Sequence, residues 1–99
     1  MERFTVYPHP DNRGYLLNIQ ADSMGHLGSK VVIPLLQASE YRLPASRLNP
    51  QFEILGEQYV LLTQSMGAMP VKLLKQAVCN LSDRAHEIVA AIDVLFNGV

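Results

Sequence analysis

The C-terminal segment, residues 82–98, carries the clearest structural pattern in this sequence. Ser82 or Asp83 stands where an N-cap residue accepts hydrogen bonds from the first helical amides. Gly98 stands where a left-handed residue commonly ends a helix. The pattern predicts one C-terminal α-helix that packs an apolar face against the rest of the chain. That face is formed at three- and four-residue spacing by Ala85, Ile88, Val89, Ile92, Leu95 and Phe96.

The preceding three quarters of the chain consist of short β-type runs separated by turn formers. The first run, residues 4–7, consists of β-branched and aromatic side chains, the later runs are largely apolar, and glycine, proline, asparagine and aspartate lie between them. Gly56-Glu57 has the composition of a two-residue type II′ hairpin turn, because glycine comes first. We therefore expect a mainly β fold of five or six strands with the helix packed on it. The expected strands cover residues 4–7, 15–21, 30–36, 52–55, 58–64 and 70–74.

Pro34 interrupts the most apolar of these runs. Residues 30–36 are apolar on both faces, as expected for a central strand. Proline has no amide hydrogen to donate to a sheet, so Pro34 should mark a bulge, a sheet edge or a strand that changes direction. Residues 37–51 contain Pro44 and Pro50 and are expected to form a connection with one short helical turn.

Length and charge restrict the classes of function. A chain of 99 residues has the size of one domain, so we expect a single domain over residues 1–99. Only 17% of the residues are charged, below the usual ~25%, so apolar groups must cover part of the surface. Such a surface on a small domain usually marks an interface, which favours a homodimer. The formal net charge of −1 argues against tight direct binding of a nucleic-acid duplex.

The sequence contains no motif specific to catalysis, a cofactor or a metal. Cys79 is the single cysteine and is expected to be a buried, inert thiol. The three histidines, His9, His26 and His86, lack ligand spacing, so we expect no metal site. The longest apolar run, residues 31–36, is far shorter than the ~20 residues of a membrane-spanning helix. No apolar signal segment lies near the N-terminus, so we expect a cytoplasmic protein. Because no cofactor motif is present either, we expect no cofactor.

One loop leaves an enzymatic alternative open. His9, Asp11 and Arg13 lie close together in a stretch dense in turn formers. An imidazole or carboxylate can move the proton of a ribose 2′-hydroxyl, and a guanidinium can stabilise the phosphorane that forms. This loop therefore keeps RNA cleavage as an alternative hypothesis.

Several segments resemble the CcdB family of toxins. The matches keep their order and span nearly the whole chain, and the Val-Ile-Pro-Leu strand together with the glycine-containing terminus is the most specific part. The matching segments are residues 4–7, 18–22, 31–35, 62–66, 69–71, 81–82, 87–88, 91–92 and 96–99.

The resemblance implies both a fold and a function. The implied fold is an SH3-like β-barrel with a C-terminal helix, of the type shared by CcdB, MazF and Kid toxins. The implied function is that of a homodimeric toxin from a type II toxin–antitoxin system. Such a toxin binds the DNA gyrase A subunit and traps the gyrase–cleaved DNA complex, which blocks replication without any catalysis by the toxin. A CcdA-type antitoxin binds the toxin, and the two together repress their operon, so DNA is contacted only through the antitoxin.

Carried over by position, the resemblance implies a set of gyrase-contacting residues. The family's best-known member has Trp at the position of Asn97, two isoleucines at Ser23-Met24 and Asn at Asp93. Loss of an interface aromatic removes on the order of 2 kcal/mol of binding. A toxin that has kept antitoxin binding and lost gyrase poisoning is therefore a second alternative. The implied contacts are Ser23, Met24, Asp93, Asn97, Gly98 and Val99.

Two further pairs of residues are assigned to contacts. Leu95 and Phe96 are expected to lie in the core or in the dimer interface. Arg42 and Arg47 are expected to bind the antitoxin, because a disordered acidic segment pairs well with apolar, arginine-bearing surface.

Overall fold

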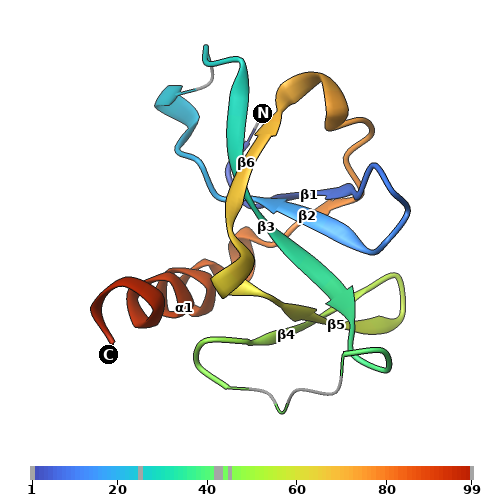
Figure 1. Cartoon of the computed structure of the whole chain (residues 1–99), viewed down its shortest axis with the longest axis vertical. Helices are drawn as coiled ribbons and strands as arrows, with labels where there is room; N and C mark the ends of the chain where they lie inside the picture. The colour runs from blue at the N-terminus through green and yellow to red at the C-terminus, as the bar shows by residue number, and fades with distance from the viewer. Residues whose placement is uncertain (1, 25, 42–43, 45, 99) are drawn as a thin grey trace.

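The computed structural model describes residues 2–24, 26–41, 44 and 46–98. Seven strands form one antiparallel sheet in the order β4-β5-β3-β2-β1-β7, and β6 also pairs with β3. The sheet curves into a nearly closed barrel, and a helix lies across its open side (Figure 1). The predicted class, mainly β with one C-terminal helix, is confirmed. The strands are β1 (Thr5–Pro8), β2 (Tyr15–Asn18), β3 (Ser29–Gln37), β4 (Gln51–Ile54), β5 (Glu57–Leu61), β6 (Gly67–Pro70) and β7 (Cys79–Asn80).

Short 3₁₀ turns connect the strands and lead into the helix. They are η1 (Asp22–Met24), η2 (Thr63–Ser65), η3 (Val71–Leu73) and η4 (Ser82–Arg84), and the helix is α1 (Ala85–Asn97). Within the described ranges no helix has the length and apolarity needed to cross a bilayer.

β3 is the central strand, and Pro34 lies where its partners change. On one side β3 pairs with β2. On the other side its first part, from Ser29 to Val32, pairs with β6, and its last part, from Leu35 to Gln37, pairs with β5. The Pro34 carbonyl accepts a hydrogen bond from the Leu62 amide, 2.9 Å away. The N and C=O of one strand residue point to the same side, so the missing amide hydrogen falls in the gap between β6 and β5. Figure 1 shows that β3 changes direction along its length, and the change of partner strands lies at Pro34, in agreement with the last of the three roles expected for it.

The hairpin between β4 and β5 forms with a different turn from the one predicted. Ile54 pairs with Glu57, so the two turn residues are Leu55 and Gly56 instead of Gly56 and Glu57. Both have positive φ, 51° and 85°, which defines a type I′ turn and corrects the predicted type II′ turn. The reason is the pairing of Phe52 with Tyr59, which fixes the register and leaves Leu55 79% exposed.

The end of the sheet also differs from the prediction. The strand expected over residues 70–74 is wrong: Pro70 ends β6, and the chain then turns through η3. The turn brings Leu74 into a small core cluster with Tyr7, Leu16 and Val32. β2 stops at Asn18 instead of reaching residue 21, and the two-residue strand β7 was not predicted.

The helix begins later than the capping pattern indicated. Neither Ser82 nor Asp83 caps α1, because both belong to η4 and the N-cap position of α1 falls on Arg84, where no side-chain capping hydrogen bond forms. The Oδ1 atom of Asn80 accepts a hydrogen bond from the Ser82 amide at 2.8 Å instead. The predicted end is confirmed: Gly98 has φ 75°, and its amide donates to the Val94 carbonyl at 2.9 Å.

The main core lies between the sheet and α1. Ile88 and Ala91 are fully buried, and Ile88 packs with buried strand side chains such as Leu17, Ile33 and Leu61. The predicted apolar face is only partly buried, because Val89 remains 36% and Phe96 67% exposed. Two of its residues therefore face away from the barrel of this chain.

Candidate partner-binding site

The end of α1 carries most of the residues predicted to contact gyrase. Figure 1 shows this end projecting beyond the barrel. Asn97 and Gly98 are exposed, and the left-handed Gly98 turns the backbone out of the helix. Val99 lies outside the described residues. The arrangement leaves the amide side chain of Asn97 accessible to a partner.

Phe96 and Leu95 differ in exposure. Leu95 is half-buried along the helix, whereas Phe96 is 67% exposed. Phe96 is therefore not part of the core of this chain, and the remaining prediction for it is a contact in the dimer interface. An exposed phenylalanine ring offers one of the largest apolar contact areas that a side chain can provide.

Asp93 lines a shallow depression on the flank of α1. Phe4, Ala85, Val89 and Ala90 make its apolar floor, and Arg3, His86 and Asp93 surround them, with a volume of about 420 Å³. The guanidinium of Arg3 lies 4.7 Å from the centre of the Phe4 ring. The depression follows α1 from its first turn to Asp93.

Ser23 and Met24 lie on η1, away from the helix end. All three residues of η1 are exposed, and Met24 is 45% exposed. Figure 1 shows η1 at the upper left of the molecule and the end of α1 at the lower left. A single chain therefore keeps η1 apart from the end of α1. Asp93 is nearer to η1, because Arg3, whose amide donates to Oδ1 of Asp22 in η1 at 2.7 Å, lines the same depression as Asp93.

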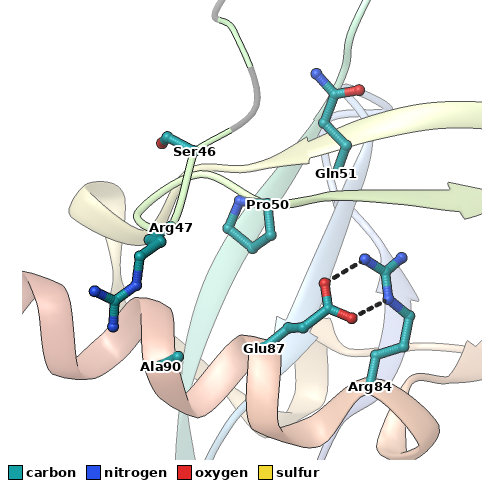
Figure 2. A pocket seen from close by; sticks show the side chains of 7 residues that line it. All are labelled: Ser46, Arg47, Pro50, Gln51, Arg84, Glu87 and Ala90. Atoms are coloured by element: carbon teal, nitrogen blue, oxygen red, sulfur yellow. Dashed lines mark hydrogen bonds and ion pairs between the residues drawn. The ribbon is translucent and has the colours of Figure 1, made fainter.

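Arg47 lies in a separate pocket between α1 and the segment before β4 (Figure 2). The pocket has a volume of about 450 Å³. Arg47 approaches it from one end, and Arg84 and Glu87 lie at the other. Arg42 lies outside the described residues. The lining residues are Ser46, Arg47, Pro50, Gln51, Arg84, Glu87 and Ala90.

Arg84 and Glu87 form a two-pronged ion pair in that pocket. The Arg84 Nε atom donates to Oε1 of Glu87 at 2.8 Å, and a second guanidinium nitrogen donates to Oε2. The hydrogen bonds from Arg84 lower the pKa of the Glu87 carboxyl, and the same bonds raise the pKa of Arg84. The guanidinium also lies 4.1 Å from the centre of the Phe52 ring. The sequence analysis did not predict this pair. Opposite charges three residues apart in a helical segment are the pattern that could have indicated it.

The loop proposed for RNA cleavage is not assembled as one cluster. The Asp11 amide donates to Nδ1 of His9 at 3.0 Å, so that nitrogen is already used within the loop. Arg13 lines a depression of about 310 Å³ together with Gln37, Glu40 and Tyr59, and neither His9 nor Asp11 lines it. The structure therefore places the predicted acid–base groups and the predicted cation in different local environments.

Metal and thiol chemistry have little support in the described ranges. There, no three histidine, cysteine or acidic side chains are grouped so as to hold a metal ion. Cys79 is half-buried rather than buried, and this burial raises the pKa of its thiol. A raised pKa reduces the thiolate fraction at neutral pH.

Comparison with known proteins decides the family. The family model described as CcdB protein matches residues 3–98, which is nearly the whole chain. This chain belongs to the CcdB family. The predicted resemblance is confirmed, and the match includes both η1 and the end of α1.

Two solved structures with a similar fold carry MazF names. The Mycobacterium tuberculosis toxin MazF-mt6 has a TM-score of 0.77 and 16% identity, over 96% of this chain and 97% of that one. The MazE-MazF structure from Deinococcus radiodurans has a TM-score of 0.72 and 14% identity, over 98% of this chain and 95% of that one. At such identities the likeness shows the fold alone. It confirms that this CcdB family chain has the predicted barrel of MazF-type toxins.

Proposed function

We propose that this CcdB family chain is the toxin of a toxin–antitoxin system and that it poisons DNA gyrase. The toxin binds the gyrase A subunit, holds the gyrase–cleaved DNA complex and so blocks replication. The observation that carries the proposal is the family match over residues 3–98, which extends to the exposed end of α1. Binding alone accounts for this activity, so the proposal assigns no catalytic residue and no cofactor.

The end of α1 supplies chemistry suited to a protein partner. Phe96 offers an exposed ring, Asn97 can donate and accept hydrogen bonds, and the left-handed Gly98 ends the helix directly after them. Interface energies concentrate in a few such aromatic anchors. The family's best-known member has a tryptophan at the position of Asn97. In this chain the neighbouring Phe96 supplies an exposed aromatic ring instead, which supports the proposal.

A homodimer completes the proposed site. Ser23-Met24 and the end of α1 lie apart in one chain, so a gyrase surface that contacts both is better served by two copies (Figure 1). Exposed apolar side chains at Met24, Leu27 and Phe96 supply surface for such contacts.

The proposed antitoxin is an acidic, CcdA-type segment that binds at the Arg47 pocket. Arg47 is exposed there beside the apolar Pro50 and Ala90. A carboxylate on the segment would pair with Arg47, while its apolar residues would bury the pocket floor. Toxin and antitoxin together would act in the cytoplasm as repressor of their operon.

The deciding experiment is a gyrase cleavage assay with the purified, full-length chain. Wild-type protein is expected to produce linear DNA with gyrase from the native host, and removal of Gly98 and Val99 is expected to abolish it. Phe96→Ala should weaken cleavage by about tenfold, the equivalent of ~1.4 kcal/mol of binding. Leu55→Ala is the control, because Leu55 is an apolar residue in the β4–β5 turn that is even more exposed than Phe96, 79% against 67%.

Each other outcome identifies a different function. A folded wild-type chain that yields no cleaved DNA contradicts gyrase poisoning. If that chain still binds its antitoxin, it is a toxin that has lost its target. If it instead cuts RNA and Arg13→Ala stops the cutting, it is a ribonuclease.

A further inference from the structure

The loop that carries Ser23 and Met24 is held in place by two side chains that flank it, Gln20 just after β2 and Lys30 in β3. The η1 turn buries none of its own side chains. The Met24 carbonyl accepts a hydrogen bond from Nε2 of Gln20 at 3.2 Å, and Nζ of Lys30 lies within donating distance at 3.5 Å. The same carbonyl accepts from the Leu27 amide at 3.2 Å. Three donors therefore converge on one oxygen of an otherwise exposed turn.

Gln20 is itself fixed at both ends of its amide. Its Oε1 atom accepts from the Val31 amide at 3.2 Å, and its Nε2 atom lies 3.4 Å from the Ser29 carbonyl. The β2–β3 ladder ends at Asn18 and Val32, so this side chain extends the link between the two strands. The donor that reaches Met24 is thus anchored to the barrel.

Lys30 is an unusual residue for a buried strand position. It is only 2% exposed, and its side chain points to the same face of β3 as Val32, which belongs to the small core cluster with Tyr7 and Leu16. Burying an ammonium group is unfavourable, and an apolar side chain of similar volume usually gives equal or higher stability. The amino group is explained by what it donates to, which is the Met24 carbonyl.

We infer that Gln20 and Lys30 are positioning residues for partner binding. By fixing the Met24 carbonyl they orient the exposed side chains of Ser23 and Met24 before a partner arrives, which reduces the entropy lost on binding. The inference rests on the proposed function, in which these two residues contact the gyrase A subunit.

Two substitutions remove the donors with little change of shape. Lys30→Met keeps a long apolar side chain and removes the amino group. Gln20→Glu keeps an acceptor for the Val31 amide and replaces the donor to Met24 by a carboxylate oxygen. Lys75→Met and Gln58→Glu make the same chemical changes at exposed positions. Lys30→Arg restores a donor and is expected to rescue Lys30→Met.

Hydrogen exchange tests the effect on the loop without gyrase. The amides of Met24 and Leu27 donate within the turn, to Ala21 and to Met24. We expect both to exchange at least several-fold faster in Lys30→Met and Gln20→Glu, with the amides of β2 and β3 unchanged. The affinity for purified gyrase A subunit is expected to fall about tenfold, the equivalent of ~1.4 kcal/mol. The control variants should match wild type in both measurements.

The two measurements separate the possible failures. Unchanged exchange in the loop overturns the inference, as does faster exchange through the whole sheet, which would mean that the pair holds the fold. Faster loop exchange with unchanged affinity overturns the positioning role. If wild-type protein does not bind gyrase A at all, the proposed function fails, and the exchange data alone decide whether Gln20 and Lys30 hold the loop.

Discussion

Gly14 lies where the loop after β1 approaches the backbone of β3. Its φ of +86° is a conformation that residues with a side chain rarely adopt. A Cβ atom at this position would lie 2.2 Å from the Leu35 carbonyl oxygen, and a backbone oxygen in a central strand has little freedom to move away. Glycine is therefore required at this position for two separate reasons.

Gly14→Ala is expected to lower the free energy of unfolding by about 2–4 kcal/mol, the sum of left-handed strain and the clash with Leu35. Gly56→Ala is the matched control, because Gly56 has nearly the same φ, +85°, and open space around its Cβ position. It should cost about 1–2 kcal/mol. Urea denaturation of both variants measures the difference, and equal losses would show that the approach to Leu35 is not a steric limit.

Arg84, the residue just before α1, connects the start of the helix to the barrel by two contacts. Arg84 pairs with Glu87 one turn later and covers the ring of Phe52 on β4. The pair is partly exposed, so solvent and salt weaken it. Its main structural effect is to join the start of α1 to the edge of the barrel through the face of Phe52.

Because the pKa of Glu87 is lower in the folded chain than in the unfolded one, the pair stabilises the fold above the ordinary carboxyl pKa. That contribution is lost as the pH falls through the depressed folded value. Glu87→Gln should therefore cost about 0.2–0.5 kcal/mol at pH 7 and nothing at a pH below the folded value. Urea denaturation at both pH values checks this, and the same substitution made in Arg84→Met should have a smaller pH-dependent effect, because only the weaker influence of His86 on Glu87 then remains.

Elements were predictable from sequence where local pattern and tertiary pairing agree. The helix and the starts of most strands follow from apolar spacing and β-branched runs. The type I′ turn at Leu55-Gly56 was missed because cross-strand pairing, and not turn composition, sets the register. β7 was missed because two residues carry no pattern, and they form a strand only by pairing with Thr5 and Val6.

The whole molecule distributes its apolar residues between a shared core and an exposed helix face. Ile88 is fully buried against the barrel, while Phe96, two turns later in the same predicted stripe, is largely exposed. Sequence spacing could not separate the two, because both have the correct helical period. Likewise, family resemblance predicts gyrase contacts at Ser23, Met24, Asp93 and Asn97, and this stays a prediction. Only the fold shows that one chain keeps Ser23-Met24 apart from the helix end.

Ile88→Ala is expected to lower the free energy of unfolding by about 2–4 kcal/mol, because it leaves a cavity between α1 and the sheet. Phe96→Ala should change the free energy of unfolding of the monomer by less than about 0.5 kcal/mol. Thermal or urea denaturation at low protein concentration makes the comparison. A large loss for Phe96→Ala that grows with protein concentration would show that Phe96 stabilises a dimer, and a loss independent of concentration would contradict its exposure.

Pro34 also protects the barrel against assembly in the wrong register. If β3 slid two residues along β6, Pro34 would take the place of Val32, which now pairs with Gly67. A ladder hydrogen bond would then be lost, because proline brings no hydrogen to the bond. A slip of a single residue would turn the core face of β3 toward solvent. In the native alignment Pro34 removes no ladder hydrogen bond. Folding intermediates with β3 shifted by one or two residues are less stable, because they lose a hydrogen bond or expose the core face of the strand.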